Sequence, residues 1–154
     1  MSTEPRAPSH KHRVMSIKAG DLIPGWTVEA VDPEKMKIMA ALLRDPNPIH
    51  LDPAAARALG LGDRVVNQGP VNFGYVQNML AAWAGGPGRI RALSLRLTAT
   101  VLAGDRLAAG GRVTSVSSGG LVECEVWLDV LERSGSPVKP PLRALAGTAS
   151  VRPR

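Results

Sequence analysis

A long apolar helix limits what this chain can fold into more than any other feature of its sequence. The pattern predicts it at residues 71–86, VNFGYVQNMLAAWAGG, and its end at two glycines and Pro87. Its apolar side chains are Val71, Phe73, Val76, Met79, Leu80 and Trp83, and they surround most of the helix. Gly74 indicates a closely approaching backbone, because glycine costs a helix roughly 1 kcal/mol relative to alanine. Such a helix must be covered on most sides, so the rest of the chain has to wrap around it.

The second half of the chain can supply that cover as a sheet. In residues 92–101, ALSLRLTATV, apolar and polar side chains alternate, as in a strand with one buried face. Further strands are expected at residues 104–118, 121–133 and 142–153, a shorter one at 25–31, and two earlier helices at 32–45 and 53–59. Gly- and Ser-rich turns, such as Gly119–Gly120 and Gly135–Ser136, join the later strands. Because helices dominate the first half and strands the second, the pattern predicts the α+β class with an antiparallel sheet.

The composition fits one folded domain in a reducing compartment. Of the 154 residues, 44% are hydrophobic, and residues 1–13 are polar and aperiodic, which predicts a mobile N-terminal arm ahead of a single domain at 14–154. The single cysteine, Cys124, argues against disulfides and a thiolate metal site. His10 and His12 in the arm could bind a metal, but we expect no metal site. Without an apolar run of about 18 residues or the apolar block of a signal peptide, we expect a cytoplasmic protein that does not cross a membrane.

The net charge of +6 has two explanations. Lys and Arg can be scattered over a solvated surface, or they can attract a polyanion such as nucleic acid or a phosphate-bearing cofactor. Basic residues gather at Arg89, Arg91 and Arg96 and at Arg152 and Arg154, without the interleaved aromatic residues of single-strand binders. We therefore expect no nucleic acid partner.

Residues 44–53, RDPNPIHLDP, carry the groups best suited to acid–base chemistry. His50 lies five positions after Asp45. Each has an ordinary structural explanation, because Asp45 can stabilise a turn and His50 can be a hydrogen-bonded, half-buried imidazole. Pro46 and Pro48 nevertheless fix the backbone twice between the two groups and hold their relative position. Rigid spacing is what proton transfer requires, since a misplacement near 1 Å can lower a rate by about a hundredfold.

Two neighbouring features complete this region. Asp52 is explained as the N-cap of the short helix that starts at Pro53. Residues 66–70, VNQGP, lead into the long apolar helix, whose first N–H groups and dipole favour an anion. This segment can serve as an oxyanion site, or it can be a helix start that happens to carry a glycine, and the physical pattern leaves both open.

The segment DPNPIHLDPAAARALG resembles the D-x-N-P-x-H-x-D signature of the MaoC-like, or (R)-specific, enoyl-CoA hydratases and dehydratases. The residue order, the spacing from Asp45 to His50 and both prolines agree. The resemblance implies the hot-dog fold, a curved antiparallel sheet wrapped around one long helix, and over residues 17–152 the similarity is one of element order. The segment VVNQGPVNFGYVQNMLAAWAG is also similar to the small hydratase subunits of actinobacterial steroid side-chain degradation.

The resemblance implies a reaction and roles for particular residues. Water is added across, or removed from, a trans-2-enoyl thioester, with Asp45 and His50 as the catalytic pair that activates the water and moves the proton to the α-carbon. A backbone N–H of Gly69 or Gln68 would bind the thioester oxygen. Coenzyme A enters as part of the substrate, and no other cofactor is expected. Its phosphates would be attracted by the basic surface.

The resemblance also implies positioning residues, and the sequence departs from the family at two places. Asn47 and Asn67 are expected to help position the substrate. Where the family has a His-Gly pair opening the central helix, this chain has Asn67-Gln68-Gly69, and the glycine ahead of the catalytic aspartate is replaced by Arg44. A backbone donor survives a side-chain change, so the oxyanion site can persist.

Two other functions stay open. A hot-dog acyl-CoA thioesterase would place a carboxylate on or near the central helix, where residues 70–80, PVNFGYVQNML, contain no Asp or Glu. A non-catalytic or half-site subunit of a heteromeric hydratase would complete the acyl tunnel of another chain, which the presence of both Asp45 and His50 argues against. Because an open sheet edge is normally covered, we expect a homodimer or a heterodimer with another hot-dog chain.

Overall fold

The computed structural model describes residues 16–154, so the expected arm at residues 1–13 and its two histidines lie outside the described residues. The helices are α1 (Pro33–Leu43), α2 (Pro53–Ala58) and α3 (Gly69–Ala84), with short 3₁₀ turns η1 (Pro48–His50) and η2 (Pro87–Arg89). The strands are β1 (Leu22–Val28), β2 (Ile90–Leu97), β3 (Arg106–Val116), β4 (Val122–Arg133) and β5 (Ser136–Val151). Every predicted helix and strand therefore has a counterpart.

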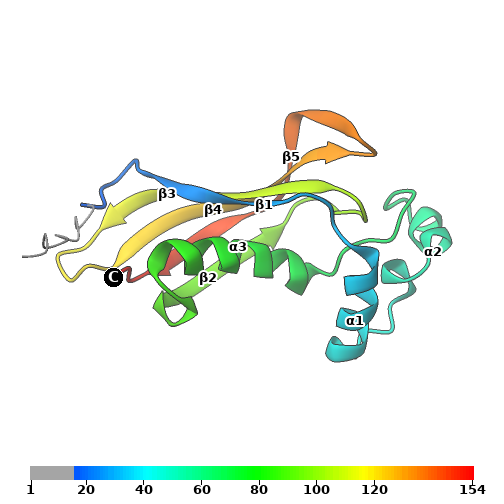
Figure 1. Ribbon diagram of the computed structural model, residues 1–154, viewed down its shortest axis with the longest axis horizontal. Helices are drawn as coiled ribbons and strands as arrows, with labels where there is room; N and C mark the ends of the chain where they lie inside the picture. Colours follow the sequence, from blue (N-terminus) through cyan, green and yellow to red (C-terminus); the bar gives the residue numbers. More distant parts are fainter. Residues whose placement is uncertain (1–15) are drawn as a thin grey trace, which may run out of the picture.

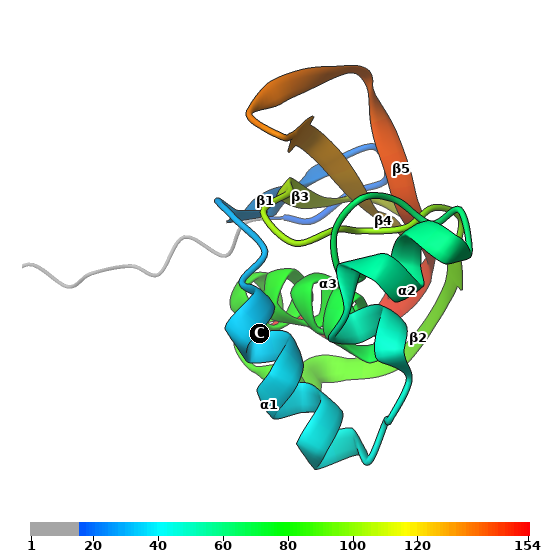
Figure 2. The same cartoon turned by 90° about the vertical axis from the view of Figure 1, so that its right-hand side faces the viewer.

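One antiparallel sheet, in the order β1-β3-β4-β5-β2, forms the body of the chain. Figure 1 shows α3 lying along this sheet. Figure 2, viewed from the end where α1 and α2 lie, shows the sheet curling from above the helix to beneath it. The predicted α+β class, with a curved antiparallel sheet around one long helix, is confirmed. β1 and β2 are the two edges of the sheet.

The core lies between the concave face of the sheet and one side of α3. The helix buries Val76, Met79, Leu80 and Ala84, each at most 1% exposed. The strand residues of the same core include Leu107, Leu128, Leu145 and Val151, all without exposed surface. Full burial of a Leu or Met side chain stabilises a fold by roughly 1.5–3 kcal/mol. This layer therefore fixes α3 against the sheet.

The other side of α3 is less covered than the sequence predicted. Pro70, Gln77, Asn78 and Ala82 are exposed, and a Cβ built on Gly74 would have no neighbour within 4 Å. The prediction that another backbone segment approaches α3 closely at Gly74 is therefore wrong. Residues 16–154 cover one side of this helix and leave its opposite side at the surface.

Strand boundaries differ from the prediction, with β1 at Leu22–Val28 rather than 25–31 and the largest differences at β5 and β2. β5 begins at Ser136 rather than at residue 142, because Ser134 and Gly135, with φ of 54° and 74°, form a tight turn that extends the hairpin with β4. Residues 98–105 leave the sheet instead of continuing β2. They hydrogen-bond to residues 65–67 ahead of α3 and form one wall of the candidate active site.

Candidate active site

The end of α1 places Asp45. The helix begins after Asp32, whose carboxylate accepts the Glu34 N–H at 2.9 Å, and it ends at Arg44 in the left-handed conformation, with φ of 52°. The Asp45 N–H then donates to the Ala40 carbonyl at 2.9 Å, which closes the last turn as in a Schellman motif. The position of Asp45 thus depends on how α1 ends.

The loop from Asp45 to His50 is held by its own side chains. Oδ1 of Asp45 accepts the Asn47 N–H at 3.1 Å, and Oδ1 of Asn47 accepts the Ile49 N–H at 3.3 Å as the N-cap of η1. The ordinary explanation of Asp45 as a turn-stabilising residue is therefore correct for one of its oxygens. Asn47 is exposed, and its role toward substrate stays a prediction.

His50 is buried, with 7% of its surface exposed. Its Nδ1 lies 2.6 Å from the Val66 carbonyl oxygen, and since a carbonyl only accepts hydrogen bonds, Nδ1 must carry the proton. In the neutral imidazole the lone pair then lies on Nε2. Nε2 is 3.3 Å from Oδ2 of Asp45, the oxygen that the turn does not use. The structure thus brings the two predicted catalytic residues into contact.

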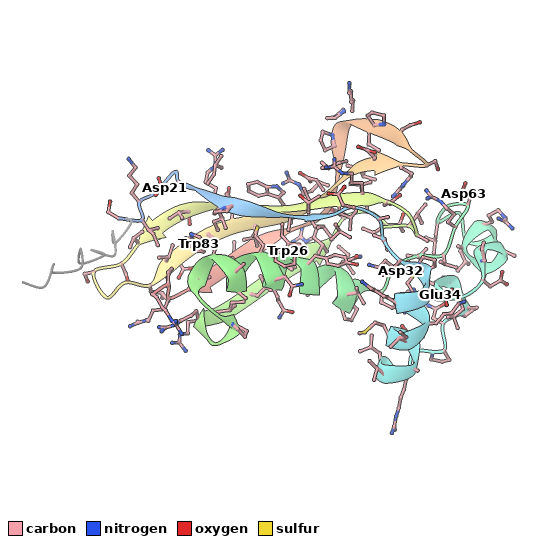
Figure 3. The ribbon with its side chains drawn as sticks, viewed as in Figure 1. Asp21, Trp26, Asp32, Glu34, Asp63 and Trp83 are labelled. Carbon is pink, nitrogen blue, oxygen red and sulfur yellow. The ribbon has the colours of Figure 1, made fainter. Side chains whose placement is uncertain are left out.

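His50 and the beginning of α3 line one pocket of about 340 Å³. The lining residues are His50, Val66, Asn67, Gly69, Asn72, Leu97, Ala99, Thr100 and Val101. In Figure 3 the beginning of α3 faces the right-hand side of the molecule, where Asp32, Glu34 and Asp63 are labelled. Trp83 is labelled toward the other end of the helix. The first turn of a helix favours negative charge through its unpaired N–H groups and its dipole, so the pocket suits a substrate oxygen that becomes an anion.

Gly69 is the first residue of α3 and lines the pocket. Its N–H has no hydrogen-bond partner within residues 16–154, and the next residue, Pro70, has no N–H. A Cβ at this position would lie 3.3 Å from Cδ1 of Leu97, so a larger residue would require the Leu97 side chain to shift by a few tenths of an ångström. The pocket therefore combines a free backbone donor with the His50 imidazole.

Gln68 carries the alternative predicted donor, its backbone N–H, but it lies outside the residues that line the pocket. Its side chain is buried, Nε2 donates to the Met36 carbonyl at 2.9 Å, and Oε1 has no partner in the described part of the chain. Gln68 thus braces the start of α3 against α1 and does not line the pocket. Of the two predicted donors, the structure places Gly69 beside His50.

Asn67 and Asn72 form a buried polar pair at the pocket. Nδ2 of Asn67 donates to Oδ1 of Asn72 at 2.7 Å. Burial raises the pKa of Tyr75 on the next turn, and a hydrogen bond from Asn67 partly opposes this. Asn72 was not predicted as a site residue, although a polar side chain on the buried side of an apolar helix is a usable signal. Asn67 lies in the pocket, and its role toward substrate stays a prediction.

Asp45 itself lines a neighbouring surface depression together with Arg44, Pro46 and Leu51. Its side chain is 34% exposed, against 9% for that of His50. His50 is therefore the residue that connects the carboxylate to the pocket at α3.

Other classes of site find little support within residues 16–154. This range holds no group of three or more His, Cys, Asp or Glu side chains that could bind a metal ion. None of its helices has the length and apolar character needed to span a membrane. Burial raises the pKa of the Cys124 thiol to about 11, which disfavours the reactive thiolate.

A curved sheet around one helix, with an aspartate and a histidine in contact near the helix N-terminus, defines a hot-dog protein with a candidate acid–base site. The family profile of the MaoC like domain matches residues 18–129. The chain belongs to this family of MaoC-like dehydratase domains. No curated protein sequence gives a significant match.

Solved structures agree with this assignment. An (R)-hydratase from A. caviae involved in PHA biosynthesis is 22% identical with a TM-score of 0.74, over 91% of this chain and 99% of that chain. R-hydratase PhaJ1 from Pseudomonas aeruginosa is 22% identical with a TM-score of 0.71, over 89% and 82%. A chain of the ChsH1-ChsH2 complex from Mycobacterium tuberculosis is 25% identical with a TM-score of 0.71, over 91% and 100%. These likenesses confirm the hot-dog fold.

Proposed function

We propose that the protein is an (R)-specific enoyl-CoA hydratase, or 3-hydroxyacyl-thioester dehydratase, that uses no metal or redox cofactor. The observation that carries the proposal is the contact between Asp45 and His50, whose imidazole shares a pocket with the free N–H of Gly69. Membership of the MaoC-like family and the likeness to two (R)-hydratase structures support it. Coenzyme A enters as the carrier part of the substrate, and the cytoplasm is the proposed compartment.

In the hydration direction, one water molecule contacts both Nε2 of His50 and Oδ2 of Asp45, which lie 3.3 Å apart. Nε2 of His50 accepts a proton from this water while the water oxygen forms a bond to the β-carbon of the enoyl group. The electron pair of the carbon–carbon double bond moves toward the thioester carbonyl, which becomes an enolate. The imidazolium, stabilised by the Asp45 carboxylate, then donates its proton to the α-carbon. One water thus supplies both the hydroxyl group and the hydrogen, and dehydration is the reverse sequence.

The N–H of Gly69 is the proposed donor to the enolate oxygen. A fixed donor of this kind typically stabilises a transition state by about 3–4 kcal/mol, and the positive end of the α3 dipole adds to the effect. Asn67 inside the pocket and Asn47 in the exposed loop are the proposed positioning residues.

A half-site subunit of a heteromeric hot-dog hydratase is the second candidate. The likeness to a chain of the ChsH1-ChsH2 complex and the position of Asp45 outside the pocket favour it. A thioesterase has less support, because the sequence of α3 contains no carboxylate. In either hydratase case we propose that the chain acts as a dimer, with itself or with another hot-dog chain.

The test is incubation of the purified chain with trans-2-enoyl-CoAs of several lengths, read by mass spectrometry. We expect the gain of one water, and Asp45→Asn and His50→Gln should each lower turnover by about a hundredfold or more with the melting temperature changed by a few degrees at most. Asp52→Asn is the matched control, because Asp52 only caps α2, through the Ala54 N–H at 2.8 Å, and asparagine caps equally well.

Each other outcome has a definite meaning. Release of free CoASH would make the protein a thioesterase, and no change in mass would make it a half-site subunit or a protein of another function. Full turnover in both His50→Gln and Asp45→Asn would reject the proposed catalytic pair.

A further inference from the structure

A buried ion cluster lies behind the pocket wall formed by residues 98–105. Asp105 has no exposed surface, and its carboxylate accepts hydrogen bonds from Nη2 of Arg133 at 2.7 Å and from Nε of Arg133 at 3.1 and 3.2 Å. Nη2 of Arg64 lies 3.5 Å away, and the Leu102 N–H donates at 2.9 Å. Asp105 is thus paired on both oxygens, which a buried carboxylate requires to be tolerated.

The two arginines of this cluster also hold the backbone of the wall. Nη2 of Arg133 donates to the Thr100 carbonyl at 2.9 Å, and Nη1 of Arg64 donates to the Ala103 carbonyl. Thr100 lines the pocket. Because Arg133 ends β4 and Arg64 precedes α3, the cluster ties two distant segments to this one wall.

The wall in turn holds residues 65–67, the segment that leads into α3. The Asn67 N–H donates to the Val101 carbonyl at 2.8 Å, and the Ala103 N–H donates to the Val65 carbonyl at 3.0 Å. Val66 lies between these two bonds and forms an isolated bridge with Leu102. A displacement of the wall therefore acts on the segment that contains Val66, whose N–H also donates to the Ile49 carbonyl at 2.9 Å.

We infer that the Arg64–Asp105–Arg133 cluster positions the catalytic groups of the pocket, the imidazole of His50 above all. The Val66 carbonyl, which lies in the segment that the wall holds, is the acceptor for Nδ1 of His50, so it keeps the proton on Nδ1 and the lone pair on Nε2. The same segment sets where α3 starts and thus where the Gly69 N–H lies. The kinetic consequence rests on the proposed function, whereas the tautomer of His50 can be measured without turnover.

The experiment is Arg133→Gln in the full chain, read by nitrogen-15 NMR of histidine-labelled protein, with the His50 signals assigned from His50→Gln. In the wild type we expect the neutral form of His50 to carry its proton on Nδ1. In Arg133→Gln we expect signals of both tautomers. The value of kcat should fall by about tenfold to a hundredfold, as for other residues that orient a reacting group through a hydrogen bond, while KM changes much less.

Arg143→Gln is the matched control. Arg143 also binds an aspartate with two nitrogens, Nε to Oδ1 of Asp129 and Nη2 to Oδ2 at 3.3 Å, but its side chain makes no hydrogen bond to residues 98–105. It should leave the His50 spectrum and kcat unchanged. Arg133→Lys keeps the charge without the planar fork, so it should restore part of the Nδ1–H tautomer, and it decides the question if Arg133→Gln does not fold.

The outcomes separate this inference from the proposed function. An unchanged His50 spectrum in folded Arg133→Gln, or an equal loss of kcat in Arg143→Gln, would overturn the positioning role. A third result is that the wild type hydrates no enoyl-CoA while Arg133→Gln still shows both His50 tautomers. That result would reject the proposed function and leave the positioning role standing.

Discussion

The two carboxylate oxygens of Asp45 make different contacts. Oδ1 accepts the Asn47 N–H and holds the turn, while Oδ2 lies 3.3 Å from Nε2 of His50. The structural explanation is therefore correct for Oδ1, and Oδ2 is left available for the proposed catalytic role. Asn keeps the acceptor for the turn and removes the negative charge, whereas Ala removes both. Asp45→Asn is for this reason the informative substitution.

The raised pKa of the Cys124 thiol predicts that the stability of the fold decreases at alkaline pH. Burial, and then the charge of Glu123, raise the pKa of its thiol from 9.0 to about 11 in the folded chain. Between these values the unfolded chain releases a proton that the folded chain keeps, so the free energy of unfolding falls as the pH rises. The contribution is intact below pH 9 and is lost through pH 11, by about 3 kcal/mol in total.

The measurement is urea denaturation of the wild type and of Cys124→Ala at several pH values from 8 to about 11, over the range that the raised pKa defines. Cys124→Ala should be less stable at neutral pH, because it leaves a small cavity. Its stability should nevertheless decline less steeply with pH. Identical slopes for the two proteins would contradict the assigned pKa.

At the scale of elements, periodicity predicted the type and order of the helices and strands, and contacts between distant residues decided where they end. The alternation in residues 92–101 predicted a strand to Val101, yet β2 ends at Leu97, and beyond it the Thr100 carbonyl accepts a hydrogen bond from Arg133. Prolines at 137, 140 and 141 are unfavourable inside a strand. The turn at Ser134 and Gly135 nevertheless continues the hairpin.

The candidate site was predictable as far as its residues lie within one short motif. Asp45 and His50 could be paired from the sequence because two prolines fix the few residues between them. Asp105 and Arg133 were missed because they lie 28 positions apart and their contact depends on the register of β3 with β4. The choice between the backbone N–H groups of Gln68 and Gly69 needed the pocket lining, which includes Gly69 and not Gln68.

The left-handed conformation of Arg44 predicts that glycine at the end of α1 stabilises the protein. A left-handed residue with a Cβ costs roughly 1–2 kcal/mol, which glycine avoids, and the φ of Arg44 is 52°. Glycine is also more flexible in the unfolded chain, so Arg44→Gly should stabilise the protein by a net of roughly 0.5–1 kcal/mol. This geometry also gives a physical reason for the glycine that the family resemblance places ahead of the catalytic aspartate.

Thermal and urea denaturation of Arg44→Gly check this, with Ala41→Gly as the control in the last turn of the same helix. Ala41 has ordinary helical geometry and is exposed, so glycine there should destabilise by roughly 0.5–1 kcal/mol. The two substitutions should thus have opposite signs. A loss of stability in both would show that the left-handed turn is not strained.

At the scale of the whole molecule, the two open edges of the sheet differ in how well they are protected. β1 contains Pro24 and an irregular register between Ile23 and Trp26, features that discourage pairing with another chain. β2 pairs regularly with β5 from Ala92 to Leu97 and contains no proline. Its outer edge is therefore the better template for a second copy.

A homodimer joined at β2 also brings the partner close to the pocket. In a two-fold pair the edge strands run antiparallel, so the beginning of the partner's β2 lies beside the end of this one, and Leu97 at that end lines the pocket. We therefore expect turnover per chain to fall when the dimer dissociates on dilution. Sedimentation velocity and initial rates over the same range of concentrations measure both quantities.

Ser94→Glu should weaken this dimer. Ser94 is exposed and lies in the middle of the regular stretch of β2, so two-fold pairing brings its two copies near each other, and like charges in that position repel. We expect the dissociation constant to rise severalfold. Thr27→Glu makes the same kind of change on the edge strand β1, where Thr27 is exposed and pairs with Ala108, and it should leave the dimer intact. Dissociation caused by Thr27→Glu rather than by Ser94→Glu would place the interface at β1, and a wild-type chain that sediments as a monomer would require a different hot-dog chain as the mate.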